Sequence, residues 1–82
     1  MPGNGWRTWI ATSPMGEILE FSEEDYRYGV GPLIMRIARV DLTSVELYDG
    51  DLWYLVEGTQ LARDGREIEF RQVTVRARAL GL

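Results

Sequence analysis

The chain lacks three residue types on which many protein sites depend. Its 82 residues include no Cys and no His, and all nine basic residues are Arg, so Lys is absent as well. Without Cys no disulfide can form, which agrees with a reducing compartment. Without His, most transition-metal sites and general acid–base schemes lose their commonest residue. Without Lys, neither a Walker-type phosphate loop nor a Schiff base can form. We therefore expect no metal site and no cofactor.

Positive charge and long apolar runs are also scarce. The net charge is −4, which argues against non-specific binding to nucleic acid and to anionic membranes. No segment approaches the length of a transmembrane span, and the first residues lack the basic and apolar regions of a signal peptide. We expect a cytoplasmic protein with no membrane partner.

The length of 82 residues corresponds to one domain, which buries only about 60% of its unfolded surface. Residues 1–5 contain Pro, Asn and two Gly, and we expect a flexible tail there. Residues 6–82 are expected to form a single small β domain. Because its core is limited and no disulfide supports it, we also expect this domain to form a homodimer.

The last third of the chain contains the strongest local signal, an Asp-Gly pair at 64–65 between two β-prone runs. A two-residue turn with positive φ at both positions would place Leu61 opposite Ile68 and Thr59 opposite Phe70. This side of the hairpin is predicted to face the core.

The buried parity changes along the second strand of this hairpin. Ile68 and Phe70 are even-numbered, whereas Val73 and Val75 are odd-numbered. A strand with a period of two residues cannot keep one buried face across such a change. We therefore expect a β-bulge near Arg71-Gln72.

Turn signals divide the rest of the chain into short segments. We predict strands over residues 6–12, 15–21 and 33–42, with a second bulge around Ala38-Arg39. Residues 52–56 are apolar at every position, which indicates a strand covered on both faces or one with an aromatic residue exposed for binding.

Two segments are less regular. Residues 43–48 fit either a strand or a one-turn helix followed by Gly50, and the Asp-Gly pair at 49–50 favours a second hairpin. Residues 22–25, Ser-Glu-Glu-Asp, indicate a short helical turn with acids in its first positions.

Some segments resemble parts of SH3 domains. Residues 51–55 (Asp-Leu-Trp-Tyr-Leu) with 65–67 (Gly-Arg-Glu) are similar to the central hairpin of that family, and residues 47–49 (Leu-Tyr-Asp) to its early aromatic motif. The order and spacing differ, and the terminal Pro and Tyr of the SH3 groove have no counterpart, so we assign no family. We predict an all-β fold, a small five- or six-stranded barrel or rolled antiparallel sheet, SH3-like in outline, with at most one short helical turn.

Aromatic residues and acids alternate in the middle of the chain. The candidate partner-binding residues are Tyr26, Tyr28, Tyr48, Trp53 and Tyr54. The acids between them are Glu23, Glu24, Asp25, Asp49 and Asp51. Aromatic grooves edged by acids suit Pro-rich or Arg-containing peptides. The alternative is that these aromatic side chains fill the core.

Arginines form a second candidate site. Residues 1–60 hold four Arg and ten acids, whereas residues 61–82 hold five Arg and three acids. An Arg-rich strand would meet phosphates, as in small-barrel RNA-binding proteins. The candidate nucleic-acid-binding residues are Arg36, Arg39, Arg71, Arg76 and Arg78. The alternative is an outward polar face, on which Thr74, Arg76 and Arg78 lie opposite an inward face of Val73, Val75 and Ala77. Some of these arginines would then pair with Glu57, Glu67 or Glu69.

No catalytic motif is present in the sequence. No His or Lys is available to activate Ser13, Ser22 or Ser44. Trp53 stands where a calcium loop beginning at Asp49 needs an oxygen ligand. We therefore expect no enzymatic activity. We interpret the chain as a non-catalytic protein-interaction or adaptor module, and the alternative is a small-barrel nucleic-acid-binding protein that uses its C-terminal Arg-rich strand.

Overall fold

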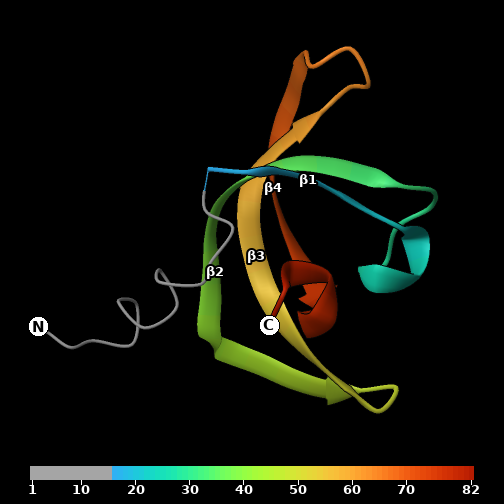
Figure 1. Cartoon of the computed structure of the whole chain (residues 1–82), viewed down its shortest axis with the longest axis vertical. Helices are drawn as coiled ribbons and strands as arrows, with labels where there is room; N and C mark the ends of the chain where they lie inside the picture. The colour runs from blue at the N-terminus through green and yellow to red at the C-terminus, as the bar shows by residue number, and fades with distance from the viewer. Residues whose placement is uncertain (1–15) are drawn as a thin grey trace, which may run out of the picture.

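A computed structural model describes residues 16–82, which form a curled antiparallel sheet with strand order β1-β2-β3-β4 (Figure 1). The elements in chain order are β1 (Ile18–Phe21), the 3₁₀ turn η1 (Glu23–Asp25), β2 (Leu33–Tyr48), β3 (Asp51–Leu61), β4 (Glu67–Arg76) and the 3₁₀ turn η2 (Ala77–Leu80). The predicted tail at 1–5 and the predicted strand at 6–12 lie outside the described residues. The all-β class is confirmed.

β2 is one long strand where the sequence indicated two. It covers both the predicted strand at 33–42 and the ambiguous segment at 43–48, so the helical alternative for that segment is wrong. Residues 16–82 hold four strands in all, and the expected five or six strands and the SH3-like outline are not confirmed.

Two irregularities let β2 bend without ending. The register with β3 shifts between Ile37 and Arg39, which confirms the predicted bulge, and again between Asp41 and Val45. At the second shift the Asp41 carboxylate accepts hydrogen bonds from the backbone N–H and hydroxyl of Thr43, at 3.0 and 2.6 Å. The hydroxyl bond and then the backbone bond hold the pKa of Asp41 below its ordinary value.

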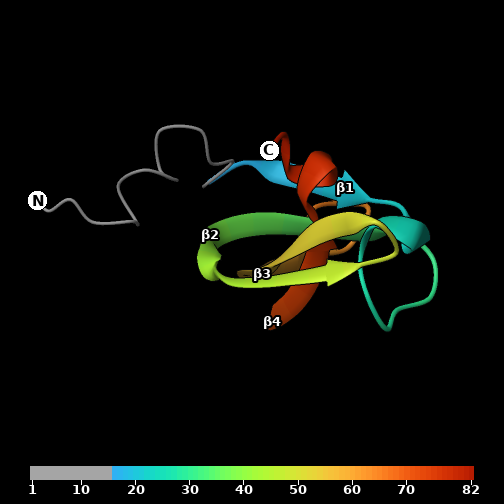
Figure 2. The ribbon, with the colours of Figure 1, turned by 90° about the horizontal axis from the view of Figure 1, so that it is seen from below.

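The curl brings the two sides of the sheet together, so that it forms a half-barrel (Figure 2). β1 pairs with β2 through Ile18–Arg36 and the pairs that follow. A few residues later the same segment reaches β4, where Tyr26 forms a bridge with Val75 and the Arg27 N–H donates to the Thr74 carbonyl at 3.0 Å. The stretch of chain that contains β1 therefore contacts both β2 and β4, the strand at the opposite edge of the sheet.

The two Asp-Gly pairs make different turns. Asp49 and Gly50 both have positive φ, 55° and 76°, as a two-residue turn requires, and the predicted second hairpin is confirmed. At 64–65 only Gly65 has positive φ, and the Ala62 N–H donates to the Arg66 carbonyl across a three-residue loop.

The register at the second turn corrects the sequence prediction. Leu61 lies opposite Glu67 and not Ile68, whereas the predicted Thr59–Phe70 pair is confirmed. The extra loop residue moves Glu67 opposite Leu61, because the Asp64 carboxylate accepts the Arg66 N–H at 2.9 Å and so fixes a wider turn. A register shift between Gln60 and Leu61 then restores the predicted pairing from Gln60 onward.

Of the predicted core face of this hairpin, Leu61 is buried, but the prediction is wrong for the second strand. Ile68 and Phe70 are exposed, whereas Val73 and Val75 are buried. The register runs without interruption from Thr59–Phe70 to Trp53–Arg76, so no bulge lies near Arg71-Gln72. No bulge is needed there, because Ile68 and Phe70 are not in the core: they lie on the opposite face of the strand from Val73 and Val75. The tip of this hairpin projects from the sheet (Figure 1).

The core fills the inner face of the half-barrel. Its buried members are Phe21, Tyr26, Leu33, Met35, Ile37, Val40, Val56, Val73, Val75 and Leu80. Leu80 comes from η2, which contacts β3 and β4. The prediction that Ala77 continues the last strand is wrong, as is the limit of one helical turn. η2 ends at Gly81, whose φ of 80° suits glycine.

No helix within residues 16–82 is long and apolar enough to cross a membrane.

Candidate functional site

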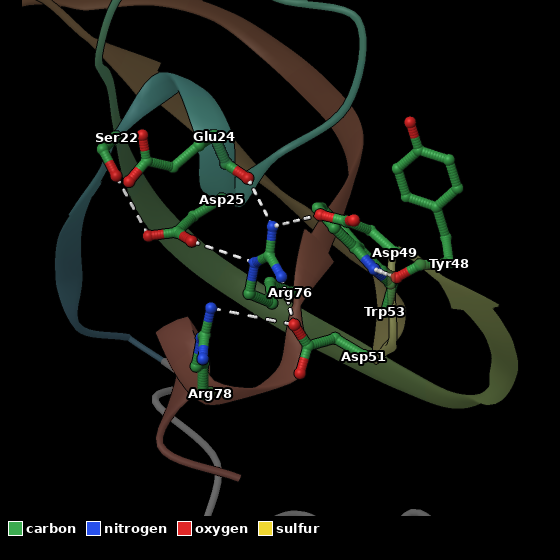
Figure 3. A network of polar contacts seen from close by, with 9 residues as sticks. All are labelled: Ser22, Glu24, Asp25, Tyr48, Asp49, Asp51, Trp53, Arg76 and Arg78. Carbon is green, nitrogen blue, oxygen red and sulfur yellow. Dashed lines mark hydrogen bonds and ion pairs between the residues drawn. The ribbon is translucent and has the colours of Figure 1, made fainter.

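Arg76 is a buried charge at the end of β4, with 6% of its surface exposed (Figure 3). Its Nε donates to Asp25 at 3.1 Å, its Nη1 donates to Asp51, and its Nη2 donates to the Glu24 carbonyl at 3.1 Å. Asp49 lies 3.6 Å from Nη2. The guanidinium thus links η1 to the turn between β2 and β3, although these two segments are far apart in the sequence.

The charge of Arg76 is maintained by these partners. Burial opposes the charge, but the hydrogen bond and charge of Asp51, followed by the charge of Asp25 and a hydrogen bond to Asp49, raise the pKa of Arg76 above its ordinary value. Every buried side-chain nitrogen and oxygen in the described part of the chain has a hydrogen-bond partner. The network is therefore fully satisfied, which is the condition under which a buried charge is tolerated.

Trp53 lies under Arg76 on the outer face of β3. The guanidinium carbon of Arg76 is 4.5 Å from the Trp53 ring centroid, and the indole N–H donates to the Tyr48 carbonyl at 2.7 Å. The Tyr48 ring meets the Trp53 ring edge-on at 5.6 Å. The apolar run at 52–56 is thus covered on both faces near Trp53, which is one of the two expected reasons for such a run.

A cleft of about 490 Å³ lies between η1 with its following loop and the β2–β3 turn. The residues that line it are Glu23, Glu24, Tyr26, Arg27, Tyr28, Gly29, Tyr48, Asp49, Trp53 and Arg76. Four of the five predicted partner-binding aromatics are therefore brought together. Tyr54 is not among them, because it packs against the core on the other face of β3.

The four aromatic residues of the cleft differ in what they can offer a ligand. Tyr26 and Trp53 are buried and form its base, and the Tyr26 hydroxyl donates to the Gly31 carbonyl at 2.8 Å. Tyr28 and Tyr48 are 89% and 50% exposed. Only this second pair presents free ring surface.

Arg27, which the sequence reading did not single out, lies between the two exposed rings. Its guanidinium carbon is 4.0 Å from the centroid of Tyr48 and 4.7 Å from that of Tyr28. Its Nη1 donates to Glu46 at 3.0 Å and its Nη2 donates to the Tyr28 hydroxyl at 2.7 Å. The signal in the sequence was its position between Tyr26 and Tyr28, but the contribution of Tyr48 depends on the fold.

The predicted nucleic-acid-binding arginines each have a local contact. Arg36 pairs with Glu67 and Arg39 with Glu57, both at 2.9 Å, as the outward-face alternative proposed. Arg71 donates to Gln60 at 3.1 Å, and Arg78 lies 3.7 Å from Asp51.

Arg76 and Arg78 do not share the exposed strand face that was predicted. β4 ends at Arg76, so Arg78 belongs to η2, and η1 covers the outer face at Arg76. Arg76 is therefore withdrawn from solvent whereas Arg78 remains exposed.

Residues 16–82 contain no group of three or more acidic side chains placed to hold a metal ion. Comparison of the chain with models of protein families, with curated proteins and with solved structures gives no match. The site is therefore interpreted from its own geometry, as an acid-edged aromatic cleft on an all-β half-barrel.

Proposed function

We propose that this protein is a non-catalytic protein-interaction module whose partner binds in the cleft between η1 and the β2–β3 turn. The exposed tyrosines carry this proposal. Tyr28 and Tyr48 present aromatic surface at the rim of a concave site, and exposed aromatic residues in such positions are typical of binding surfaces.

The charge around the cleft supports a protein ligand over a nucleic acid. Glu23, Glu24 and Asp49 line it, whereas its two arginines are engaged by acids of the chain itself. An acidic rim repels phosphate and attracts basic segments of proteins. The predicted arginine surface is less favourable for nucleic acid, since Arg36, Arg39 and Arg76 already pair with carboxylates.

The test is capture of a partner from the lysate of the native host, with wild-type protein and with the Tyr28→Ala and Tyr48→Ala variants. Both tyrosines are exposed enough that their loss should leave the fold intact, which circular dichroism checks. Phe70→Ala is the matched control, because Phe70 is an exposed aromatic residue at the far hairpin.

We expect one protein to be captured by the wild type and by Phe70→Ala, with and without nuclease, and lost with either tyrosine variant. Capture that is unchanged by the tyrosine variants contradicts the cleft as the binding site. Capture that disappears with nuclease contradicts a protein ligand and favours the nucleic-acid alternative.

A further inference from the structure

We infer that the cleft recognises an arginine side chain of its partner, and that Arg27 occupies this arginine site when no partner is bound. This inference rests on the proposed function, because it names the chemistry of the ligand at the same cleft.

The surroundings of Arg27 define what the site recognises. Two tyrosine rings lie against its guanidinium at 4.0 and 4.7 Å, and one carboxylate, that of Glu46, accepts a hydrogen bond at 3.0 Å. Two aromatic rings and a hydrogen-bonded carboxylate match a flat, delocalised cation better than they match the compact ammonium of lysine. A Pro-rich segment would need the space that the Arg27 side chain fills.

Displacement of the Arg27 side chain does not require the sheet to open. The Arg27 backbone N–H donates to the Thr74 carbonyl, and this contact is independent of the side chain. The Arg27 side chain is itself only 19% exposed, but the groups it contacts, Tyr28, Tyr48 and Glu46, are half-exposed or more. Contacts at such exposed positions are weak in water.

The loop that carries Tyr28 is suited to rearrangement. Tyr28 has a φ of 68°, a conformation that is unusual for a bulky residue, and Gly31 follows with a φ of 75°. The Tyr28 side chain makes contact with Arg27 through both its ring and its hydroxyl. When the Arg27 side chain leaves, Tyr28, Tyr48 and Glu46 are free to enclose a second guanidinium.

Charge complementarity favours a cation as the replacement. The Glu46 carboxylate loses its partner when Arg27 withdraws, and Glu23, Glu24 and Asp49 already line the cleft. Arg76 does not compensate for Glu23 and Glu24, because Asp25, Asp51 and Asp49 engage it. An incoming arginine therefore restores the charge balance of the site.

Isothermal titration of the full chain with three short Gly/Ser peptides tests the inference. One peptide carries two arginines, the second carries two lysines in their place, and the third carries two prolines. We expect the arginine peptide to bind the wild type most tightly, and Tyr48→Ala and Glu46→Gln to weaken its binding.

The Arg27→Ala variant is the decisive comparison. Because it removes the internal competitor, we expect it to bind the arginine peptide about five- to thirty-fold more tightly than the wild type does. Arg66→Ala is the matched control. It changes the net charge equally but removes an exposed side chain at the β3–β4 turn, and should leave the affinity unchanged. Arg27→Lys, which keeps the charge but not the planar stack, provides a second variant if Arg27→Ala does not fold.

Equal affinities of Arg27→Ala and Arg66→Ala, or equal binding of the three peptides, would overturn the inference, as would the absence of binding to any of them. The proposed function fails in a different way, when partner capture does not depend on Tyr28 and Tyr48. A partner that needs these tyrosines but shows no preference for arginine leaves the proposed function standing and removes the inference alone.

Discussion

Arg76 joins three segments that are distant in the sequence. Asp25 belongs to η1, Asp49 lies in the β2–β3 turn and Asp51 begins β3, and Arg76 ends β4 (Figure 3). These segments form the walls of the cleft. The position of the exposed tyrosines therefore depends on a guanidinium that is almost fully buried.

We expect Arg76→Ala to lower the midpoint of urea unfolding by about 2 M or more, because it removes the cation that Asp25 and Asp51 share and leaves Asp51 only its long contact with Arg78. Arg78→Ala is the control. Its side chain is exposed and its ion pair with Asp51, at 3.7 Å, is long, so the midpoint should hardly change. Equal midpoints for the two variants would show that the buried network does not support the fold.

At the residue scale the sequence identified side-chain chemistry better than side-chain position. Tyr28, Tyr48 and Trp53 were recognised as an aromatic group edged by acids because these residues are close in the sequence. Arg76 was placed outward because strand alternation was the available rule. Whether another segment covers the outer face of a strand depends on the tertiary structure, and the alternating pattern of β4 does not indicate that η1 packs there.

At the element scale, the Asp-Gly pairs predicted where the chain forms a hairpin but not which type of turn connects its strands. Both Asp-Gly pairs predict a hairpin, and both form one, yet the loops differ in length. Asp49 adopts positive φ, whereas the Asp64 carboxylate instead accepts a backbone N–H two residues on. A local side-chain bond thus decided between two turns that the dipeptide alone does not distinguish.

The continuity of β2 was equally hard to predict. Its first bulge was predicted from the change of parity, but its second irregularity, between Asp41 and Val45, looks in the sequence like the end of a strand. In the structure they are the points at which one strand bends, and the bend helps to bring the β2–β3 turn to η1.

Gly58 allows β2 and β3 to approach each other closely at the first bulge, because it has no side chain. A Cβ at this position would overlap the Arg36 carbonyl and lie 3.1 Å from the Met35 methyl. We expect Gly58→Ala to lower the free energy of unfolding by about 1–3 kcal/mol, because backbone cannot move aside as a flexible side chain does.

Gly50→Ala gives the comparison for this prediction. The space around Gly50 is open, and only its φ of 76° opposes a side chain, so we expect a cost of about 1 kcal/mol, measured by urea unfolding. A Gly58→Ala protein as stable as the wild type would mean that the two strands separate easily at the bulge.

At the scale of the whole molecule, the fold class followed from local patterning, while the way the sheet curls did not. Alternation, turns and the absence of long helical periods indicate an all-β chain. The Tyr26–Val75 bridge, which links the two sides of the sheet, joins residues 49 positions apart, and nothing near either residue signals the other.

The outer surface of the sheet suggests how the expected homodimer forms. The strand registers place Ile18, Arg36, Thr59 and Phe70 in one row across β1 to β4. Ile18 and Phe70, at its two ends, are 57% and 61% exposed. Arg36 within the row is paired with Glu67, so its charge does not oppose contact with an apolar surface. Two copies could bury these residues against each other, since a row of this kind is complementary to itself under two-fold symmetry.

We expect the chain to self-associate at concentrations of about 100 μM, and Phe70→Glu to remain monomeric at the same concentration because it places a carboxylate in the row. Sedimentation velocity over a dilution series measures both. Tyr28→Ala is the control, since Tyr28 is more exposed than Phe70 yet belongs to the cleft, and its loss should not alter association. A wild-type sedimentation coefficient that is independent of concentration contradicts the homodimer. Association that is lost with Tyr28→Ala but retained with Phe70→Glu moves the interface to the cleft, where a second copy of the chain would compete with the proposed partner.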